Sequence, residues 1–308
     1  MDPKSLACSF ATLVTNDDYV SGALTLAHSL RSNGTSHEIV VLCPPNALSN
    51  RSLSLLYRAF DRIIYVPLWT NRSNKENLQL LGRPELDITY SKLHVFNPAY
   101  LEYSTVCFID ADAFALQNCD SIFDLLSPDM HFAAAPDVGW PDSFNSGVFV
   151  LRPNAQIYES LVWHATYGAG SWDGGDQGLL NRFFKSWSGF PGKETELSIS
   201  ADAPPQPVCP TEFTRAARLP FIYNVTPSAI YSYLPAVKEF QSDMTIIHFA
   251  GHDKPWNQSR FTDGTVWSRS LSPEIVTLHN AWWKARDGLS LKWQEEDRVS
   301  SYSFNFVN

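Results

Sequence analysis

The sequence has little basic charge and few cysteines. Its 23 lysines and arginines are outnumbered by 32 aspartates and glutamates, which gives a formal net charge of −9 at pH 7. Because no basic stripe offsets this charge, the chain would repel a polyanion, and we expect no nucleic acid as a main partner. Five widely spread cysteines without a Cys-x-x-Cys pair argue against a disulfide framework and against a zinc site.

Long hydrophobic runs are also missing. The stretch that follows Met1 is too short and too polar for a signal peptide or a membrane span. We therefore expect a soluble protein of the reducing cytoplasm, without membrane association. The 308 residues, 44% of them hydrophobic, can build a sizeable core in one large domain or in at most two small ones.

Short apolar runs alternate with helical patterns in the first half of the chain. We predict strands over 10–14, 38–42, 62–66 and 105–109, and helices over 20–30 and 53–60. Asp17 or Asp18 is the expected N-cap of the first helix. This β-α-β-α-β succession is typical of an α/β fold in which helices flank a mainly parallel central sheet.

The second half is less regular. We predict strands over 132–135 and 148–151, and helices over 157–167 and 176–184. The segment 185–218 is rich in proline and poor in apolar residues, which predicts a long loop. The spacing of Ile275, Leu278 and Trp282 predicts a helix that packs on the body of the protein, with a tail over the last ten residues.

The strand predicted over 105–109 ends in Asp110-Ala111-Asp112. In a parallel sheet, ligands bind beyond the carboxyl ends of the strands, where two carboxylates one residue apart can converge on a hard divalent cation. A polar strand end is the alternative. His248 ends another apolar run, as a core histidine or as a third ligand. Two aspartates, one imidazole and a diphosphate would suit Mn²⁺ or Mg²⁺.

Two glycine-containing segments supply further polar groups. Gly251 follows His248 and would let the backbone approach a ligand closely, and Lys254 could neutralise a phosphate. The turn 173–178 supplies two acids, an amide and three glycines, a set that can surround a polyhydroxylated ligand or can simply begin a helix. The segment 144–148 offers a similar polar edge. No dinucleotide-binding, P-loop or esterase motif is present.

Together these motifs resemble the glycogenin family of retaining glucosyltransferases. The resemblance runs in the same order over residues 9–258 and rests on the segments 13–19, 83–86, 89–94, 110–112, 136–150, 173–181, 219–224, 230–235 and 248–256. It implies a GT-A (Rossmann-like) catalytic domain over 1–268, with the helix and tail of 269–308 packed on it. It also implies UDP-glucose as the donor, a divalent cation (Mn²⁺ or Mg²⁺), and a protein tyrosine as the first acceptor.

The resemblance also implies roles for individual residues. The metal would be held by Asp110, Asp112 and His248. The donor would be bound by Leu13, Thr15, Asn16 and Tyr19 around uridine, by Arg83 and Lys92 near the phosphates and sugar, by Ala111, Gly251 and Lys254 around the diphosphate, and by Asn145, Ser146, Asp173, Gly174, Asp176 and Gln177 around glucose. Tyr231 matches the tyrosine that becomes glucosylated.

Retention of anomeric configuration leaves two mechanisms open. In a double displacement, Asp176 or Asp173 would be the nucleophile, with Lys92 close by. In a same-face attack, the leaving phosphate takes the acceptor proton. The sequence does not choose between them.

The resemblance implies a homodimer that extends a glucan chain on itself and primes glycogen. A tail of the kind that recruits glycogen synthase is not evident, so we expect that partner either through residues beyond this chain or through a different contact. Two other functions remain open. One is a related retaining transferase with a free sugar or polyol acceptor, and the other is a catalytically silent scaffold that binds a sugar nucleotide.

Overall fold

Strands from both halves of the chain form one central sheet in the order β3-β2-β1-β4-β7-β6-β8. The computed structural model describes residues 8–70, 75–80, 82, 84–189, 203–232, 234–268 and 271–304, without the side chains of 75, 84–87, 231, 232 and 295–304. The seven strands found there are β3 (Arg62–Tyr65), β2 (Glu38–Cys43), β1 (Cys8–Leu13), β4 (Thr105–Ile109), β7 (Phe144–Leu151), β6 (Phe132–Pro136) and β8 (Ala216–Arg218).

The direction of the strands places several strand ends at one edge. Strands β3, β2, β1 and β4 are parallel, as their nearly continuous apolar sequences predicted. Strand β7 runs antiparallel to β4, so its first residues lie beside the last residues of β4. The Asp110 amide donates to the Gly147 carbonyl at 2.8 Å and continues this pairing. The mainly parallel sheet is confirmed, with β7 as the strand that reverses.

Two small antiparallel pairs lie outside the main sheet. Strand β5 (Ala113–Ala115) pairs with β9 (Ile246–His248), in a register that sets Ala113 opposite His248. Strand β10 (Ser259–Arg260) pairs with β11 (Val266–Trp267). The β5–β9 pair joins the carboxyl edge of the main sheet to a segment more than a hundred residues away in sequence.

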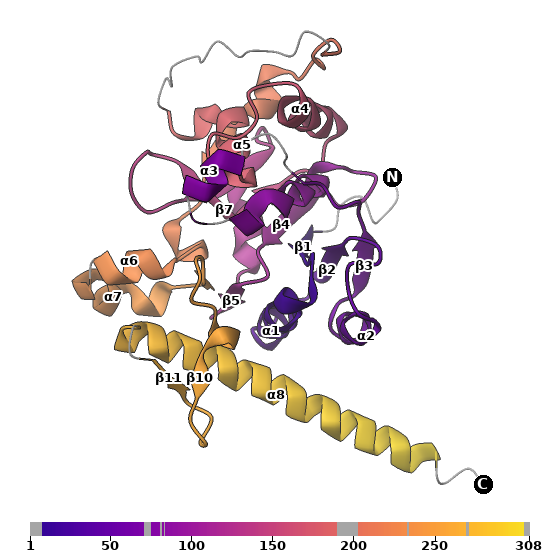
Figure 1. Ribbon diagram of the computed structural model, residues 1–308, viewed down its shortest axis with the longest axis vertical. Helices are drawn as coiled ribbons and strands as arrows, with labels where there is room; N and C mark the ends of the chain where they lie inside the picture. Colours follow the sequence, from indigo (N-terminus) through magenta and orange to yellow (C-terminus); the bar gives the residue numbers. More distant parts are fainter. Residues whose placement is uncertain are drawn as a thin grey trace.

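Helices cover both faces of the sheet (Figure 1). The α-helices are α1 (Val20–Ser32), α2 (Asn50–Ala59), α3 (Lys75–Leu80), α4 (Ala155–Thr166), α5 (Asp176–Phe183), α6 (Pro227–Ser232), α7 (Leu234–Phe240) and α8 (Pro273–Phe304). The 3-10 helices are η2 (Asp17–Tyr19), η3 (Pro84–Phe96), η4 (Asp120–Leu125), η5 (Lys185–Trp187), η6 (Thr211–Thr214), η7 (Phe221–Tyr223), η8 (Gln241–Asp243) and η9 (Pro255–Asn257).

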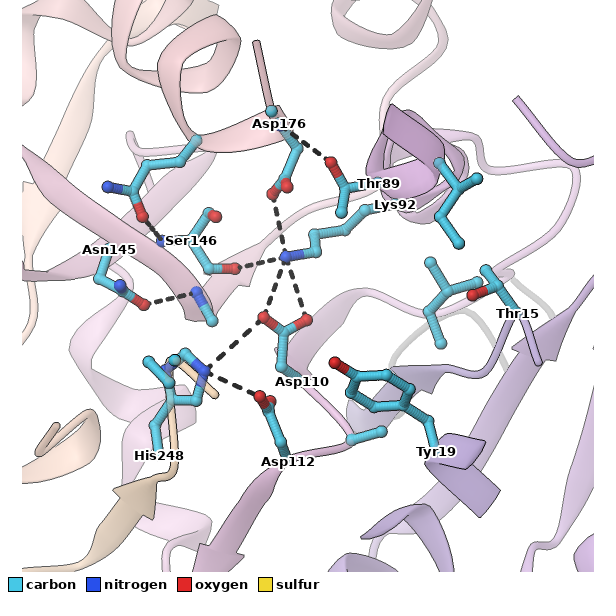
Figure 2. Close-up of a pocket in the computed structure, with 18 of the residues that line it drawn as sticks. Thr15, Tyr19, Thr89, Lys92, Asp110, Asp112, Asn145, Ser146, Asp176 and His248 are labelled. Atoms are coloured by element: carbon cyan, nitrogen blue, oxygen red, sulfur yellow. Dashed lines mark hydrogen bonds and ion pairs between the residues drawn. The ribbon is translucent and has the colours of Figure 1, made fainter. Parts of the chain in front are cut away.

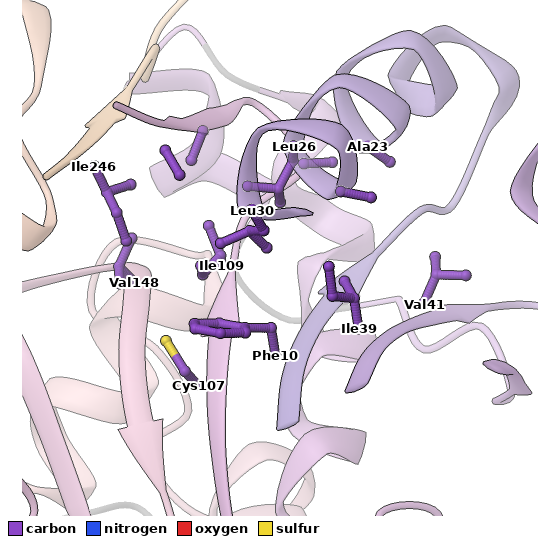
Figure 3. Packing of buried hydrophobic residues seen from close by; sticks show 14 of the residues in the cluster. Phe10, Ala23, Leu26, Leu30, Ile39, Val41, Cys107, Ile109, Val148 and Ile246 are labelled. Atoms are coloured by element: carbon purple, nitrogen blue, oxygen red, sulfur yellow. The ribbon is translucent and has the colours of Figure 1, made fainter. Parts of the chain in front are cut away.

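Each face of the sheet has its own hydrophobic core. On one face, Leu26 and Leu30 of α1 lie close to Phe10 and Ile109, as Figure 3 shows. On the other face, η3, α4 and α5 pack around Phe108 and its neighbours. Burial of this apolar surface holds the strands that carry the polar residues in fixed positions.

Three sequence expectations need correction. The segment 185–218 is not a loop throughout, because it contains η5, η6 and the strand β8, which pairs with Phe132–Ala134. A short edge strand needs little burial, so its sequence carries no strong apolar signal. The first helix is preceded by η2, whose cap is Asn16, which accepts from the Asp18 amide, and neither aspartate is the cap. Helix α8 continues to Phe304, where we expected a tail.

Helix α8 lies under α1, α6 and α7 and extends beyond the rest of the body (Figure 1). Its Trp282 is fully buried in a third apolar cluster with Phe249 and Ile247. In the part of the chain that the structure describes, no helix has both the length and the apolar composition needed to cross a bilayer.

Candidate active site

A cavity of about 390 Å³ opens at the carboxyl edge of the central sheet. It gathers residues from β1, η2, η3, the turn between β4 and β5, β7, α5 and β9. Its walls are formed by Leu13, Thr15, Asn16, Tyr19, Ile88, Thr89, Lys92, Asp110, Ala111, Asp112, Asn145, Ser146, Gly147, Trp172, Asp173, Gly175, Asp176, Gln177, His248, Ala250 and Gly251. Most of the residues proposed from sequence therefore meet in one place.

The floor of the cavity holds Asp110, Asp112 and His248 (Figure 2). Asp110 follows β4, Asp112 precedes β5, and the β5–β9 pairing brings His248 next to them. His248 Nε2 lies 3.3 Å from Asp112 Oδ1 and 4.0 Å from Asp110 Oδ2. One ligand atom from each residue lies within 4.8 Å of the other two. Two carboxylates and one imidazole on this scale fit a Mn²⁺- or Mg²⁺-type cation.

Lys92 of η3 lies between two acidic groups. Its Nζ is 3.0 Å from Asp110 Oδ1 and 2.9 Å from Asp176 Oδ2, and it donates to the Ser146 carbonyl at 3.1 Å. Asp176 Oδ2 accepts no aligned hydrogen bond from the described residues, so the contact to Lys92 is an ion pair. A buried carboxylate oxygen in this state can still accept a hydrogen bond from a ligand.

Burial and charge separate the pKa values of the two neighbouring aspartates. Burial raises the pKa of Asp110 to about 6, with a further contribution from Asp112 and against the effect of Lys92. Burial also acts to raise the pKa of Asp112, but Lys254 and His248 outweigh it and hold that pKa well below its usual range. For Lys92, burial favours the neutral amine, yet Asp110 and Asp176 raise its pKa above the ordinary value.

Lys254 is buried next to Asp112 and does not line the cavity. Its Nζ pairs with Asp112 Oδ2 and donates to the Phe249 carbonyl at 2.8 Å. It also lies 5.9 Å from the centre of the Tyr19 ring. Contact between Lys254 and a phosphate stays a prediction, because its ammonium is bound to Asp112 here.

The two acids of the 173–178 turn, at the start of α5, make different contacts. Asp173 Oδ1 accepts from the amides of Gly175 at 2.9 Å and Gly178 at 3.1 Å, and burial raises the pKa of this carboxyl. Asp173 therefore anchors the turn. The Asp176 amide donates to Thr89 Oγ1 at 3.2 Å, and its carboxylate faces Lys92. Asp176 is the acid of this pair that is directed to the centre of the cavity (Figure 2).

Some sequence predictions fall outside the cavity. Arg83 lies outside the described residues. Gly174 does not line the cavity, whereas the next residue, Gly175, does. Tyr231 lies in α6, and its side chain lies outside the described part of the structure.

Several residues of the cavity wall have no role predicted from the sequence. These are Ile88, Thr89, Gly147, Trp172, Gly175 and Ala250. Four of them lie inside segments already singled out, and Ile88 and Trp172 adjoin such segments, so proximity in sequence was the available signal. The acids, amides and cationic side chains next to them in sequence are the groups whose chemistry indicated a site.

Two solved glycosyltransferases share this fold. The glycosyltransferase GlyE of Streptococcus pneumoniae superposes with a TM-score of 0.56 at 17% identity, over 93% of this chain and 64% of that one. The galactosyltransferase LgtC, solved with donor and acceptor sugar analogues, superposes with a TM-score of 0.53 at 16% identity, over 89% of this chain and 95% of that one. The chain therefore has the GT-A fold of these two glycosyltransferases, with a carboxylate-lined cavity at the edge of its sheet.

Sequence comparison identifies the family to which the chain belongs. The pattern of glycosyl transferase family 8 matches residues 11–260. Glycogenin-1 of Oryctolagus cuniculus is 39% identical over 89% of this chain and 74% of its own length. Glycogenin-1 of Homo sapiens is 41% identical over 81% and 62%, and that of Caenorhabditis elegans 41% identical over 82% and 51%. The chain belongs to glycosyl transferase family 8 and, within it, to the glycogenins.

The enzyme class follows from this membership. The chain is a glycosyltransferase, and its family implies a sugar-nucleotide donor and a divalent metal ion. The chain spans between half and three quarters of the length of these curated relatives.

Proposed function

We propose that this protein transfers glucose from UDP-glucose to its own Tyr231 and then extends the chain through α-1,4 links, which primes glycogen. One observation carries the proposal. A single cavity holds the Asp110–Asp112–His248 cluster beside the Asp173–Gln177 turn, in a chain 39% identical to a glycogenin.

The donor would span the cavity from β1 to α5. Leu13, Thr15, Asn16 and Tyr19 form the wall nearest β1, where a planar base and a ribose would bind. Asp110, Ala111 and Asp112 follow in the middle, which suits a diphosphate. Ser146, Asp176 and Gln177 supply hydrogen-bonding groups at the far wall, where a hexose would present its hydroxyls.

The metal site fits a Mn²⁺ ion held by Asp110, Asp112 and His248. When bound there, the cation would neutralise the charge that develops on the departing diphosphate. Two lysine side chains of the protein hold the carboxylates of this site in place. Lys92 orients Asp110 and Asp176, and Lys254 holds Asp112. Asp176, fixed through Thr89, is placed to orient the sugar.

Tyr231 is the proposed acceptor. It lies in α6, which follows a short segment bridged to β9 through Val225 and Ile247. The segment that leads into α6 therefore lies beside the strand that carries His248. A phenolic oxygen is a suitable acceptor for a glycosyl group.

Intact-mass spectrometry tests the acceptor. The parent protein, incubated with UDP-glucose and Mn²⁺, is expected to show a ladder of hexose increments, which Tyr231→Phe should lack. Tyr57→Phe, at an exposed tyrosine on α2, is the matched control and should keep the ladder. A ladder in Tyr231→Phe would contradict the assignment, and UDP release without any ladder in the parent would favour a free acceptor.

The glycogenin relatives also lead us to propose a homodimer, with glycogen synthase as a further partner. Mixed subunits test transfer between copies. Asp112→Asn keeps the acceptor and loses a metal ligand, whereas Tyr231→Phe keeps the active site and lacks the acceptor. Hexose on the Asp112→Asn subunit only after mixing would support transfer between subunits, and none would limit transfer to one chain.

A further inference from the structure

His248 has a hydrogen-bond partner on the side of its ring away from the cavity. Its Nδ1 lies 3.0 Å from Oδ1 of Asn224, a residue with no solvent exposure. The isolated bridge between Val225 and Ile247 holds this segment beside β9. Asn224 neither lines the cavity nor belongs to the donor-binding residues given above. A fully buried amide of this kind needs partners for both its oxygen and its nitrogen.

Asn224 belongs to a continuous set of side-chain amides. Its Nδ2 donates to Asn145 Oδ1 at 3.0 Å, and Asn145 Nδ2 donates to Asp137 Oδ2 at 3.4 Å. Gln177 Nε2 donates to the same Asp137 oxygen at 2.9 Å. The set thus joins His248 to the wall of the cavity at α5.

Two backbone amides fix the orientation of this set. The Gly147 amide donates to Asn145 Oδ1 at 2.9 Å, and the Ser146 amide donates to Gln177 Oε1 at 3.1 Å. A backbone N–H can only donate, so each of these side-chain atoms must be an oxygen. Asn224 must then turn its nitrogen to Asn145, which leaves its oxygen facing His248.

The consequence reaches the ring of His248. An oxygen facing Nδ1 can only accept, so a neutral ring carries its proton at Nδ1 and its lone pair at Nε2. Nε2 is the nitrogen that faces Asp112 and Asp110.

We propose that Asn224 is a positioning residue that holds His248 in the tautomer and the orientation that binds a divalent cation. This inference rests on the metal site of the proposed function. The Gly147 amide is a fixed donor to Asn145 Oδ1, and the orientations of Asn145, Asn224 and the His248 ring follow from it.

The position of Gly147 supports the same arrangement. A Cβ atom at this residue would lie 2.1 Å from Cε1 and 2.4 Å from Nδ1 of the His248 ring. Only glycine lets the strand approach the ring this closely. The ring is therefore confined by β7 on one side and by Asn224 on the other.

Two substitutions at Asn224 separate positioning from general stability. Asn224→Ala removes the acceptor for Nδ1, and we expect the Kd for Mn²⁺ to rise about 10- to 100-fold. Asn224→Asp keeps an oxygen for Nδ1 but cannot donate to Asn145. It should therefore lose thermal stability while it keeps a Kd for Mn²⁺ close to that of the parent. The readout is free Mn²⁺ measured by electron paramagnetic resonance, with and without UDP, beside the midpoint of thermal unfolding.

Asn33→Ala is the matched control. Asn33 Nδ2 donates to the carbonyls of Ser29 at 2.9 Å and Ala115 at 3.0 Å, outside the amide set. This variant should lose stability and keep its Mn²⁺ affinity. Equal Mn²⁺ affinity in Asn224→Ala and Asn33→Ala would overturn the inference. If Asn224→Ala fails to fold, Asn224→Asp decides alone, and a tenfold loss of affinity in that folded variant would overturn it.

The parent protein and Asp112→Asn distinguish the two levels of the argument. Mn²⁺ binding by the parent that Asp112→Asn abolishes would support the metal site, whatever Asn224 does. A parent that binds no Mn²⁺ with or without UDP would overturn both the metal site and the role of Asn224.

Discussion

At the scale of single residues, the site is a balance of buried and partly buried charges. Asp110, Asp112 and Asp176 are matched by the ammonium groups of Lys92 and Lys254, which gives 2 − 3 = −1 when all five are ionised. A divalent cation would turn this excess of negative charge positive and would create a site for a diphosphate. The lysines thus keep the carboxylates ionised and in place, because unpaired buried charges are costly.

Removal of Lys92 should therefore destabilise the fold as well as the site. Lys92→Met leaves the partly exposed Asp110 and the buried Asp176 without their shared cation, and the free energy of unfolding should fall by about 3 kcal/mol. Urea denaturation at pH 7.5 measures this change. Lys238→Met, at an exposed position on α7, is the control and should stay within about 0.5 kcal/mol of the parent. A loss below about 1 kcal/mol in Lys92→Met would show that both acids are neutralised in another way.

At the scale of elements, the site depends on how closely helix α1 approaches the turn between β4 and β5. A Cβ atom at Gly22 would lie 2.3 Å from the Ala111 carbonyl oxygen and 2.8 Å from the Trp256 ring. Ala111 separates the two aspartates of the metal site. The helix and this turn therefore meet backbone to backbone, and a side chain at Gly22 would separate them.

Gly22→Ala should lower the free energy of unfolding by about 1–3 kcal/mol, because the added Cβ would overlap a backbone carbonyl, which shifts less easily than the end of a flexible side chain. We also expect weaker binding of UDP with Mn²⁺, measured by titration calorimetry. Gly288→Ala on α8 is the matched control, since nothing lies within 4 Å of the added Cβ. That change should stabilise the helix by about 0.5–1 kcal/mol. The same sign of change in both variants would refute the close-packing argument.

The apolar strands and most of the site could be predicted from sequence. Strands buried on both faces have continuous apolar sequences, so β1 and β4 were recognisable, and Asp110 followed directly. Strand β8 has only three half-buried or exposed residues, so no periodicity marks it. The cap at Asn16 was missed because two acids follow it. Asn224 carries no motif of its own, and only the three-dimensional path of the amides connects it to His248.

At the scale of the whole molecule, helix α8 packs against the segment around β9 and buries Ile247 and Phe249. Its Trp282 and His279 are fully buried, and His279 packs edge to face on Phe249, with ring centres 4.9 Å apart. Neither ring nitrogen of His279 has a hydrogen-bond partner among the described residues. Burial lowers the pKa of His279 to about 4, with Asp253 acting in the opposite direction. The docking of α8 therefore favours the neutral imidazole.

This arrangement predicts a loss of stability in mild acid. The unfolded chain binds a proton at His279 near pH 6.5, whereas the folded chain binds it only near pH 4. The stabilising effect is therefore present above about pH 6.5 and is lost as the pH falls towards 4. Between pH 7.5 and 4.5 this one residue should cost about 2 kcal/mol of the free energy of unfolding, measured by urea denaturation at each pH.

The variant His279→Leu isolates this contribution, because carboxylates other than Asp253, which interacts with His279, titrate equally in both proteins. Its free energy of unfolding should decline less steeply than that of the parent between pH 6.5 and 4.5, and the two curves should run parallel above pH 7. Parallel curves over the whole range would mean that the folded protein admits a charged His279. A change in the separation of the two curves only below about pH 6.5, with the parent losing more stability than the variant, would instead show that the packing of His279 of α8 on Phe249 requires a neutral ring.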